Sequence, residues 1–469
     1  MSLLSTIHIS ADRPPLLVDD VLLRIFCSCN IHVILTLSQS SRHFHDLAFS
    51  KQVWLAVLSD LQRRNFIDLL PGQQLNQLTS NELVNLAKRA VLGPRSWTDT
   101  SRPRIASQFI LKSSITDPDN GNNIADENKA ELLPGGQFLL FRHQETLECL
   151  TVQEGKHLWQ YRGPWVNSNV QAFAAVVTDD GRACIIIVGI RTYALYGEDD
   201  ELNQNYVEIL HLDFSTGSAT TLIRERVPKT IYDNAFSGLK ICGDFAIAAV
   251  RHANYILVFK LSTRSYKPLA DSTGLHLIDL IPGHVLLLTP NYALKTVEIW
   301  IWSIESLFES IEHSPRITDI APVMKVAVEG VIVHQAYRLS VHPSPLWKDS
   351  STLWVLVSST RSNPPASLFH KYRISHPKGG LLSVNLVSTT KVDKAYPISD
   401  RLLNVSHAGN VEVFDNREEH FFSLTSPGEH IDIDLPDRGN YIHMSPYSGA
   451  LTYVTNDVYD EKIFVNYYE

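Results

Sequence analysis

Residues 16–54 constrain the fold more than any other part of this chain, because three short segments with helical spacing follow one another there. The first segment has apolar side chains at the i, i+3, i+4, i+7 spacing of one helix face: Leu22, Ile25, Phe26 and Cys29. Asp19 and Asp20 stand at its start, where carboxylates accept hydrogen bonds from free backbone N–H groups and suit the helix dipole. The spacing predicts an amphipathic helix that begins near these two acids.

Two more short helices are expected directly after the first. One covers about Val33 to Leu37 and is almost wholly apolar, and the next follows Ser40 or Ser41, either of which can cap it. The third helix places three apolar residues on one face, namely Phe44, Leu47 and Ala48, and Trp54 follows. About forty residues cannot bury so many large apolar groups by themselves. Part of this surface must therefore meet the rest of the chain or a partner.

This pattern resembles the F-box, the module that docks on the Skp-type adaptor of cullin-RING ubiquitin ligases. The resemblance covers about residues 14–54, and the matching residues are Leu17, Asp19, Asp20, Val21, Leu22, Leu23, Ile25, Phe26, Ile34, Leu35, Leu37, Ser40, Ser41, Arg42, Phe44 and Trp54. The chain departs from the usual pattern in three places: Val18 replaces Pro, Cys29 replaces Leu, and residues 31–34 replace a Pro-x-Asp-Leu loop. These departures bear on adaptor affinity more than on fold. The alternative interpretation is a plain three-helix hairpin packed on a larger domain.

The resemblance implies a Skp-type adaptor as partner and, through it, a cullin. The residues expected to bind the adaptor are Leu17, Leu22, Ile25, Phe26, Ile34, Leu35, Leu37 and Trp54. The departures at Val18 and Val33 leave open whether adaptor binding is weakened.

Length and composition restrict the remaining possibilities. A chain of 469 residues is too long for one ordinary core, so several domains or one large repeat structure are expected. The net charge of −9 is spread without blocks, which argues against a nucleic-acid partner and against an anionic membrane surface. We see no secretory signal, no membrane-spanning run and no C-x-x-C motif among five scattered cysteines. These features favour a reduced protein of the cytoplasm or nucleus.

A helical extension is expected over residues 55–95, between the F-box-like segment at 14–54 and the rest of the chain, with a flexible tail at 1–13. Thr79 and Glu82 have the spacing of a capping box, and Leu78 and Leu83 that of a hydrophobic staple. Gly93-Pro94 is a helix stop signal. The sequence therefore predicts a helix that begins after Thr79 and ends before Gly93.

After Pro94 short strand-like runs replace the helical spacing. These runs are Gln137–Arg142, Thr146–Val152, Phe173–Thr178, Ala183–Ile190, Phe245–Arg251, Ile256–Lys260, Val285–Thr289, Val297–Trp302, Thr352–Ser358 and Val411–Phe414. A glycine turn opens several pairs of runs, and Gly243 and Gly283 are one period of 40 residues apart. Periods of this size with several strands per unit indicate a β-propeller of about seven blades over residues 100–469. A pair of β-sandwiches is the structural alternative.

The fold class expected for the whole chain is α+β and multidomain: an N-terminal all-α F-box helical unit followed by an all-β, propeller-like domain. This order of domains resembles a large group of F-box proteins in mushroom-forming fungi. The segments that suggest it are 49–54, 62–66, 132–136 and 445–452. A propeller must hide its end strands, so we expect Lys462–Tyr468 to share the terminal blade with Ile105–Leu111.

No catalytic signature is present among the motifs H-E-x-x-H, paired C-x-x-C, G-x-S-x-G and the P-loop. His430, Asp432 and Asp434 alternate on a possible strand face, which is more typical of a wet edge strand than of a metal site. Trp300 and Trp302 also share a strand face, and packing between blades is favoured over an aromatic recognition platform. No cofactor or metal is expected.

The function that these features favour is a non-catalytic substrate-recognition subunit of a Skp–cullin–F-box ubiquitin ligase. The F-box would dock the adaptor and the propeller would bind a protein target, whose identity and degron the sequence does not specify. Two alternatives stay open. One is an F-box–propeller scaffold without a ligase role, and the other is a propeller enzyme, which would need a charged and ordered central channel.

Overall fold

The computed structural model describes most of the chain. The described residues are 18–97, 103–112, 129–143, 146–165, 167–178, 180–193, 204–229, 235–251, 255–270, 277–291, 293–309, 315–330, 336–359, 366–394, 403–415, 418–424, 430–431, 433, 442–455 and 462–469. The expected tail at 1–13, Leu17, Asp432 and Asp434 lie outside them.

The N-terminal part is a helical unit, as the sequence predicts. Its elements are α1 (Asp19–Ser28), α2 (Ile31–Ser38), α3 (Arg42–Ala48), α4 (Lys51–Arg63), the 3₁₀ helix η1 (Leu75–Gln77), α5 (Ser80–Leu92) and the 3₁₀ helix η2 (Arg95–Trp97). The apolar faces of α1 to α5 meet in one core that includes Phe26, Leu58 and Leu83. Since these helices share one core, they form a single packed unit.

Local capping explains where these helices begin. Ser41 accepts a hydrogen bond from the Phe44 N–H at 3.1 Å and so caps α3. Thr79 and Glu82 form the complete capping box at the start of α5. The helix expected from about Val33 begins two residues earlier, at Ile31, because the Asn30 side chain caps α2 by accepting from the Val33 N–H at 2.9 Å. Residues 31–34, which stand where the F-box pattern has a Pro-x-Asp-Leu loop, thus make its first turn.

The rest of the described chain is a seven-bladed β-propeller, because its strands form seven four-stranded sheets. We number these sheets as blades 1 to 7 in chain order. Blade 1 has β2 (Lys129–Leu132), β3 (Phe138–His143), β4 (Thr146–Thr151) and β5 (His157–Arg162). Blade 2 has β6 (Ser168–Val177), β7 (Ala183–Thr192), β8 (Gln204–Asp213) and β9 (Ser218–Val227). Blade 3 has β10 (Phe236–Cys242), β11 (Phe245–Val250), β12 (Tyr255–Lys260) and β13 (Ser265–Ala270).

The remaining four blades complete the ring. Blade 4 has β14 (Ile278–Ile281), β15 (His284–Asn291), β16 (Thr296–Ser303) and β17 (Met324–Ala327), with α6 (Ile304–Glu309) and η5 (Ile317–Asp319) between the last two. Blade 5 has β18 (Ala336–Pro343), β19 (Ser350–Ser359), β20 (Ala366–Ser375) and β21 (Ser383–Val392). Blade 6 has β22 (Leu403–Val405), β23 (Asn410–Asp415), β24 (Glu418–Ser423) and β25 (His430–Ile431). Blade 7 has β26 (Ile442–Met444), β27 (Leu451–Val454), β28 (Lys462–Tyr468) and, as its fourth strand, β1 (Ile105–Lys112).

The blades are joined into a ring by apolar packing between neighbouring sheets. The first strands of several adjacent blades lie side by side, for example β10 with β6 and with β14. Each interblade core takes side chains from two sheets, as Ile187 of blade 2 packs with Ala248 of blade 3. The repeat expected at 40 residues is confirmed, since Gly243 and Gly283 both make the tight turn after a first strand, with φ of 58° and 73°.

The ring closes where the sequence predicts. β1 pairs antiparallel with β28, from Lys112 opposite Lys462 to Ile105 opposite Tyr468. The chain segment that follows the helices thus supplies the outer strand of the last blade, and this pairing protects an edge that would otherwise invite aggregation. Trp97 lies just before β1 and packs against Tyr468, with ring centroids 5.4 Å apart. The expected domain boundary near residues 95–100 therefore runs through packed contacts.

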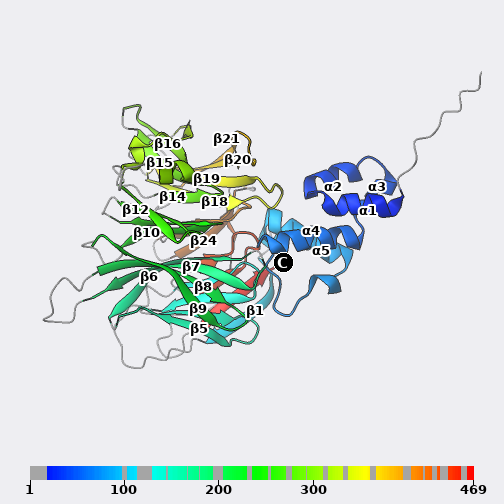
Figure 1. Cartoon of the computed structure of the whole chain (residues 1–469). Helices are drawn as coiled ribbons and strands as arrows, with labels where there is room; N and C mark the ends of the chain where they lie inside the picture. Colours follow the sequence, from blue (N-terminus) through cyan, green and yellow to red (C-terminus); the bar gives the residue numbers. More distant parts are fainter. Residues whose placement is uncertain are drawn as a thin grey trace, which may run out of the picture.

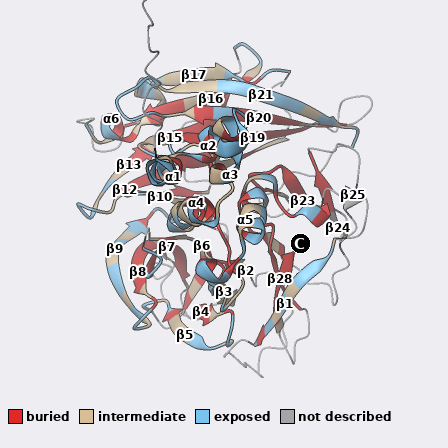
Figure 2. Ribbon diagram, turned by 90° about the vertical axis from the view of Figure 1, so that its right-hand side faces the viewer, coloured by how far each residue is buried: buried red, intermediate tan, exposed pale blue. Residues whose placement is uncertain are grey.

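The helical unit lies on one end of the ring. Figure 1 shows α1, α2 and α3 standing out beyond α4 and α5 on the side away from the blades. The view in Figure 2 looks onto this end and shows α4 and α5 over the middle of the ring. The helical unit is therefore placed so that α1 to α3 project from the ring.

Removing residues 462–469 should break the ring. The deletion takes away five apolar side chains that are buried in the ring: Ile463, Phe464, Val465, Tyr467 and Tyr468. The free energy of unfolding should fall by more than about 5 kcal/mol, which is comparable with the whole stability of many domains. We expect an insoluble chain or a much lower melting temperature, measured by thermal denaturation. Ile110→Ala, on the exposed side of β1, is the control that should melt like the wild type. Unchanged solubility and melting of the truncated chain would contradict this account of closure.

Candidate functional site

The helical unit exposes an apolar stripe on α1. Val18, Val21 and Ile25 are 68%, 42% and 44% exposed, and their spacing of three and four residues places them on one side of the helix. On α2, Val33 and Leu35 are 37% and 40% exposed. We call these five residues the α1–α2 apolar face. Exposed apolar residues on one side of a projecting helix, such as Val18, Val21 and Ile25 on α1, are typical of a protein–protein contact. Val33 and Leu35 are two residues apart and point to different sides of α2.

The residues expected to bind an adaptor fall into two groups in the structure. Ile25 and Leu35 are exposed, and Leu22 and Leu37 are half-buried. Phe26, Ile34 and Trp54 are at most 3% exposed and lie in the core of the helical unit. These three side chains stabilise the helices and present no free contact surface, because they are packed inside the shared core of the helical unit. Leu17 is outside the described residues. The adaptor-binding assignment therefore stays a prediction, carried by the exposed residues.

A buried carboxylate fastens the helical unit to the ring. Asp68, which is 3% exposed, lies in the connection between α4 and α5. Its oxygens accept hydrogen bonds from the Gly135 N–H of blade 1 at 2.9 Å and from the Ser445 and Ser448 hydroxyls of blade 7. The first and last blades are therefore both bound to the same side chain of the helical unit.

Two further polar contacts extend this attachment to other blades. Arg64 donates to the Ser344 carbonyl oxygen of blade 5 at 2.7 Å, and its guanidinium lies 4.6 Å from the Phe66 ring centroid. Asn65 donates to the Val177 carbonyl oxygen of blade 2 at 2.8 Å. The Phe66 ring meets Tyr447 of blade 7 edge-on at 4.7 Å. The helical unit is thus held by polar and aromatic contacts to four blades.

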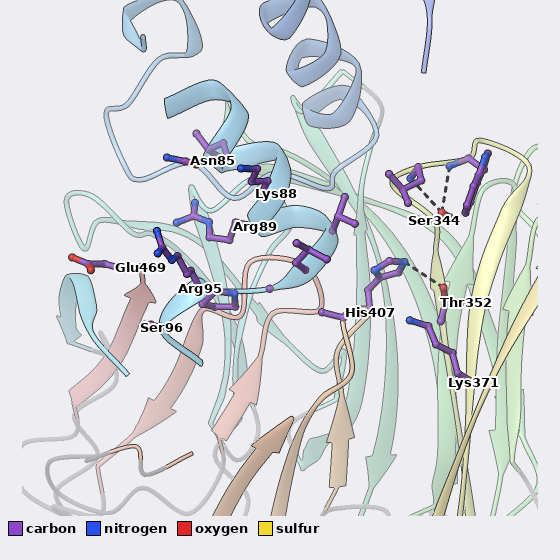
Figure 3. A pocket seen from close by; sticks show the side chains of 18 of the residues that line it. Asn85, Lys88, Arg89, Arg95, Ser96, Ser344, Thr352, Lys371, His407 and Glu469 are labelled. Atoms are coloured by element: carbon purple, nitrogen blue, oxygen red, sulfur yellow. Dashed lines mark hydrogen bonds between the residues drawn. The ribbon is translucent and has the colours of Figure 1, made fainter. Parts of the chain in front are cut away.

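The junction encloses a cleft of about 1080 Å³, which we call the junction cleft. Its walls come from α5 and the residues that follow it, the loop at 344–347, strands β19 to β21 and the turn after β22. Figure 3 shows Arg89 and Arg95 on one side of the end of α5, and Lys371 and His407 on the other. Volumes of this order are typical of small-molecule sites.

Two histidines at the cleft side of blades 5 and 6 are neutral near pH 7. The imidazole of His342 lies 2.8 Å from the Val405 carbonyl oxygen, and that of His407 lies 3.3 Å from the Thr352 hydroxyl. Loss of hydration lowers the pKa of His342 to about 4. Loss of hydration also lowers the pKa of His407 to about 3, and the positive charge of Lys371 adds to that shift. Both rings therefore contribute hydrogen bonds and no charge.

First strands of the blades carry charges that pair with one another. Lys129 lies 2.8 Å from Glu131, and Lys240 lies 3.1 Å from Asp279. Burial by itself would raise the pKa of Glu131, but the positive charge and the hydrogen bond of Lys129 outweigh it and the pKa is lowered. Charges matched in this way are typical of structural ion pairs. They give no specific support to the enzyme alternative.

The other sites considered in the sequence are structural or untested. Trp302 is fully buried and donates to the Ile320 carbonyl oxygen at 2.8 Å, which confirms the packing interpretation for that residue. Trp300 is half-buried, and Lys325 lies 3.7 Å from its ring centroid. Among the described residues, no group of three or more His, Cys, Asp or Glu side chains can hold a metal ion. The hypothesis for His430, Asp432 and Asp434 involves residues outside that part of the chain.

Comparisons with known proteins add little to this geometry. No protein-family model matches the chain, and no curated protein sequence matches it. Among solved structures, the β-propeller domain of Cps50 (Swd1) from Myceliophteria thermophila is similar, with a TM-score of 0.45 and 9% sequence identity over 74% of this chain and 98% of that chain. A likeness at this level carries no argument about function. The propeller assignment rests on the seven sheets.

No helix in the described ranges has the length and apolar character needed to span a membrane.

Asp68 and the basic residues of the junction cleft were not predicted from the sequence. Lys371 and Arg373 alternate along a strand, so their shared face was readable from the sequence. Nothing local indicates that this face meets α5 across a cleft. The neighbours of Asp68 in sequence likewise give no sign of its role, since its hydrogen-bond partners are more than sixty residues away in the chain.

Acid should destabilise the folded protein through His342 and His407. Below about pH 6.5 an unfolded chain protonates its histidines, whereas these two stay neutral in the folded state until about pH 4 and about pH 3. The unfolded state then binds more protons, so the free energy of unfolding should fall as the pH drops from about 6.5 to about 4. Urea unfolding across this range measures the slope. His342→Gln keeps a donor for the Val405 carbonyl and should give a shallower slope.

The control for this measurement is His157→Gln, because His157 is exposed on β5. It should leave the pH dependence of unfolding as in the wild type. A His342→Gln variant with the wild-type slope would show that His342 is not a source of the acid sensitivity.

Proposed function

We propose that this protein is a substrate-recognition subunit of a Skp–cullin–F-box ubiquitin ligase. The α1–α2 apolar face would dock a Skp-type adaptor, which binds a cullin, and the propeller would bind a protein target. The observation that carries the proposal is the unpartnered apolar stripe of Val18, Val21 and Ile25 on a projecting helix. It coincides with the segment 14–54 whose residues resemble an F-box.

Two features of the fold support this division of labour. The helical unit is fixed to the ring through Asp68 and Arg64, so a bound adaptor would stand in a defined direction from the blades. The ring offers many loops on a rigid support, which suits recognition of a macromolecule. A subunit of this kind does no bond chemistry, and it raises the effective concentration of a target near the conjugating enzyme. We accordingly propose a non-catalytic role in the cytoplasm or nucleus.

The test replaces the two exposed apolar residues of α1 that lie inside the helix. Val21→Asp with Ile25→Asp puts two charges on the α1–α2 apolar face and should leave the core intact, because both side chains are already in contact with water. Burial of each apolar side chain against an adaptor contributes about 1.5–3 kcal/mol. Adaptor affinity should therefore fall by more than about tenfold. Titration calorimetry with a purified Skp-type adaptor measures the change.

The matched control is Leu294→Asp with Val323→Asp. These residues are 66% and 51% exposed and lie on blade 4, far along the chain from the helices. The control should bind the adaptor like the wild type. Equal affinity of the α1 variant and the wild type would refute docking through this face. Absence of adaptor binding by the wild-type chain would refute the ligase role and favour a scaffold.

A further inference from the structure

The junction cleft concentrates positive charge in a protein that is acidic as a whole. Six basic residues line it: Lys88, Arg89, Arg95, Arg104, Lys371 and Arg373. The acidic side chains that line it are those of Glu82 and Glu469. The carboxylate of Glu82 already accepts hydrogen bonds from the Thr79 N–H and hydroxyl, both at 2.7 Å. The excess of cations runs against the net charge of −9.

Lys371 and Arg373 are held in place without being neutralised. The Lys371 ammonium lies 5.0 Å from the Trp354 ring centroid, and the Arg373 guanidinium lies 5.0 Å from that of Trp347. Aromatic faces attract cations but carry no compensating net charge. Burial lowers the pKa of Lys371, and no carboxylate in the described part of the chain offsets that effect. A half-buried cation in this setting gains most from an anionic ligand.

Hydroxyl groups on the cleft wall have unused hydrogen-bonding capacity. The hydroxyl oxygens of Ser96 and Ser350 are buried and have no hydrogen-bond partner among the residues that the structure describes. Buried polar groups of folded proteins are nearly always paired. Hydroxyls beside lysine and arginine are the usual partners of phosphate oxygens, which accept several hydrogen bonds at once.

The end of α5 does not account for all of this charge. The C-terminal end of α5 lines the cleft and attracts cations, but a helix C-terminus is equivalent to about half of one negative charge. Arg89 also faces the Asp68 carboxylate, but the remaining five cations still exceed that amount. Figure 3 shows Arg95 on one side of the helix end and Lys371 on the other. The surplus is sufficient for a ligand with more than one negative group.

We propose that the junction cleft binds a small molecule that carries several phosphate groups. Lys371 and Arg373 hold one part of it, and Lys88 and Arg95 hold another part across the end of α5. The volume of about 1080 Å³ exceeds the need of a single phosphate ion. This proposal is independent of the ligase role, because the lining residues all lie outside α1, α2 and α3.

Titration calorimetry on the full chain tests the proposal, with tripolyphosphate as the probe and inorganic phosphate as a second arm. Tripolyphosphate should bind more tightly than phosphate by at least about tenfold, since it reaches cations on both sides of the cleft. Lys371→Gln with Arg373→Gln should weaken tripolyphosphate binding by about tenfold or more. The difference should persist at about 0.15 M salt, because salt largely screens only charges more than about 8 Å apart and the probe would contact these two cations directly.

The matched control is Lys156→Gln with Lys378→Gln, which removes two exposed charges that do not line the cleft. It should bind tripolyphosphate like the wild type. If the variant with Lys371→Gln and Arg373→Gln fails to fold, Lys88→Gln with Arg95→Gln repeats the test at exposed positions. Absence of tripolyphosphate binding, or an equal loss of affinity in the control, would overturn the proposal.

Discussion

The carboxylate of Asp68 joins three parts of the molecule that are far apart in sequence. It accepts from Gly135 in blade 1 and from Ser445 and Ser448 in blade 7, while the chain on either side of it belongs to α4 and α5. Such charge-assisted hydrogen bonds are stronger than neutral ones, and each contributes about 1.5–3 kcal/mol. Blades 1 and 7 are also the two ends of the ring, so the same carboxylate supports closure and docking together.

Because Asp68 binds the helical unit to the ring, it also fixes the orientation of the α1–α2 apolar face relative to the blades. The α1–α2 apolar face and the ring keep a fixed relative direction because the connection between them is packed and hydrogen-bonded. A receptor that places a target near an enzyme needs such a direction, and a flexible tether would spread the target over a larger volume. The junction cleft lies in the same joint, so a ligand bound there would contact the helical unit and blade 5 at once.

Features that depend on neighbours in sequence, on an internal repeat or on the closure of a ring were predictable. The capping box of Thr79 and Glu82 spans three residues, and its geometry follows from the residue types alone. The strand pairing of Ile105–Lys112 with Lys462–Tyr468 was also predictable, because a ring has to pair the strands at its two ends. The blade size was predictable as well, because Gly243 and Gly283 occupy equivalent turns of successive blades and their separation is the length of one repeat.

Features that depend on which faces meet in space were not predictable. Ile25 and Phe26 are adjacent on one apolar helix face, but the packing of the other helices covers Phe26 and leaves Ile25 in water. Apolar spacing identifies a face and does not say how wide the covered part is. The partners of Asp68 and the meeting of Lys371 with α5 depend on the same long-range packing.

Hydrogen exchange on an Asp68→Asn variant tests most directly whether this carboxylate makes one body of helices and ring. The free energy of unfolding of the variant should be lower by about 3 kcal/mol or more, because the buried hydroxyl groups of Ser445 and Ser448 lose a charged acceptor. Amides of α5, β3 and β27 should then exchange faster together, while Asp46→Asn, at an exposed position on α3, should leave them unchanged. Faster exchange in α5 alone, or wild-type exchange throughout, would contradict the account.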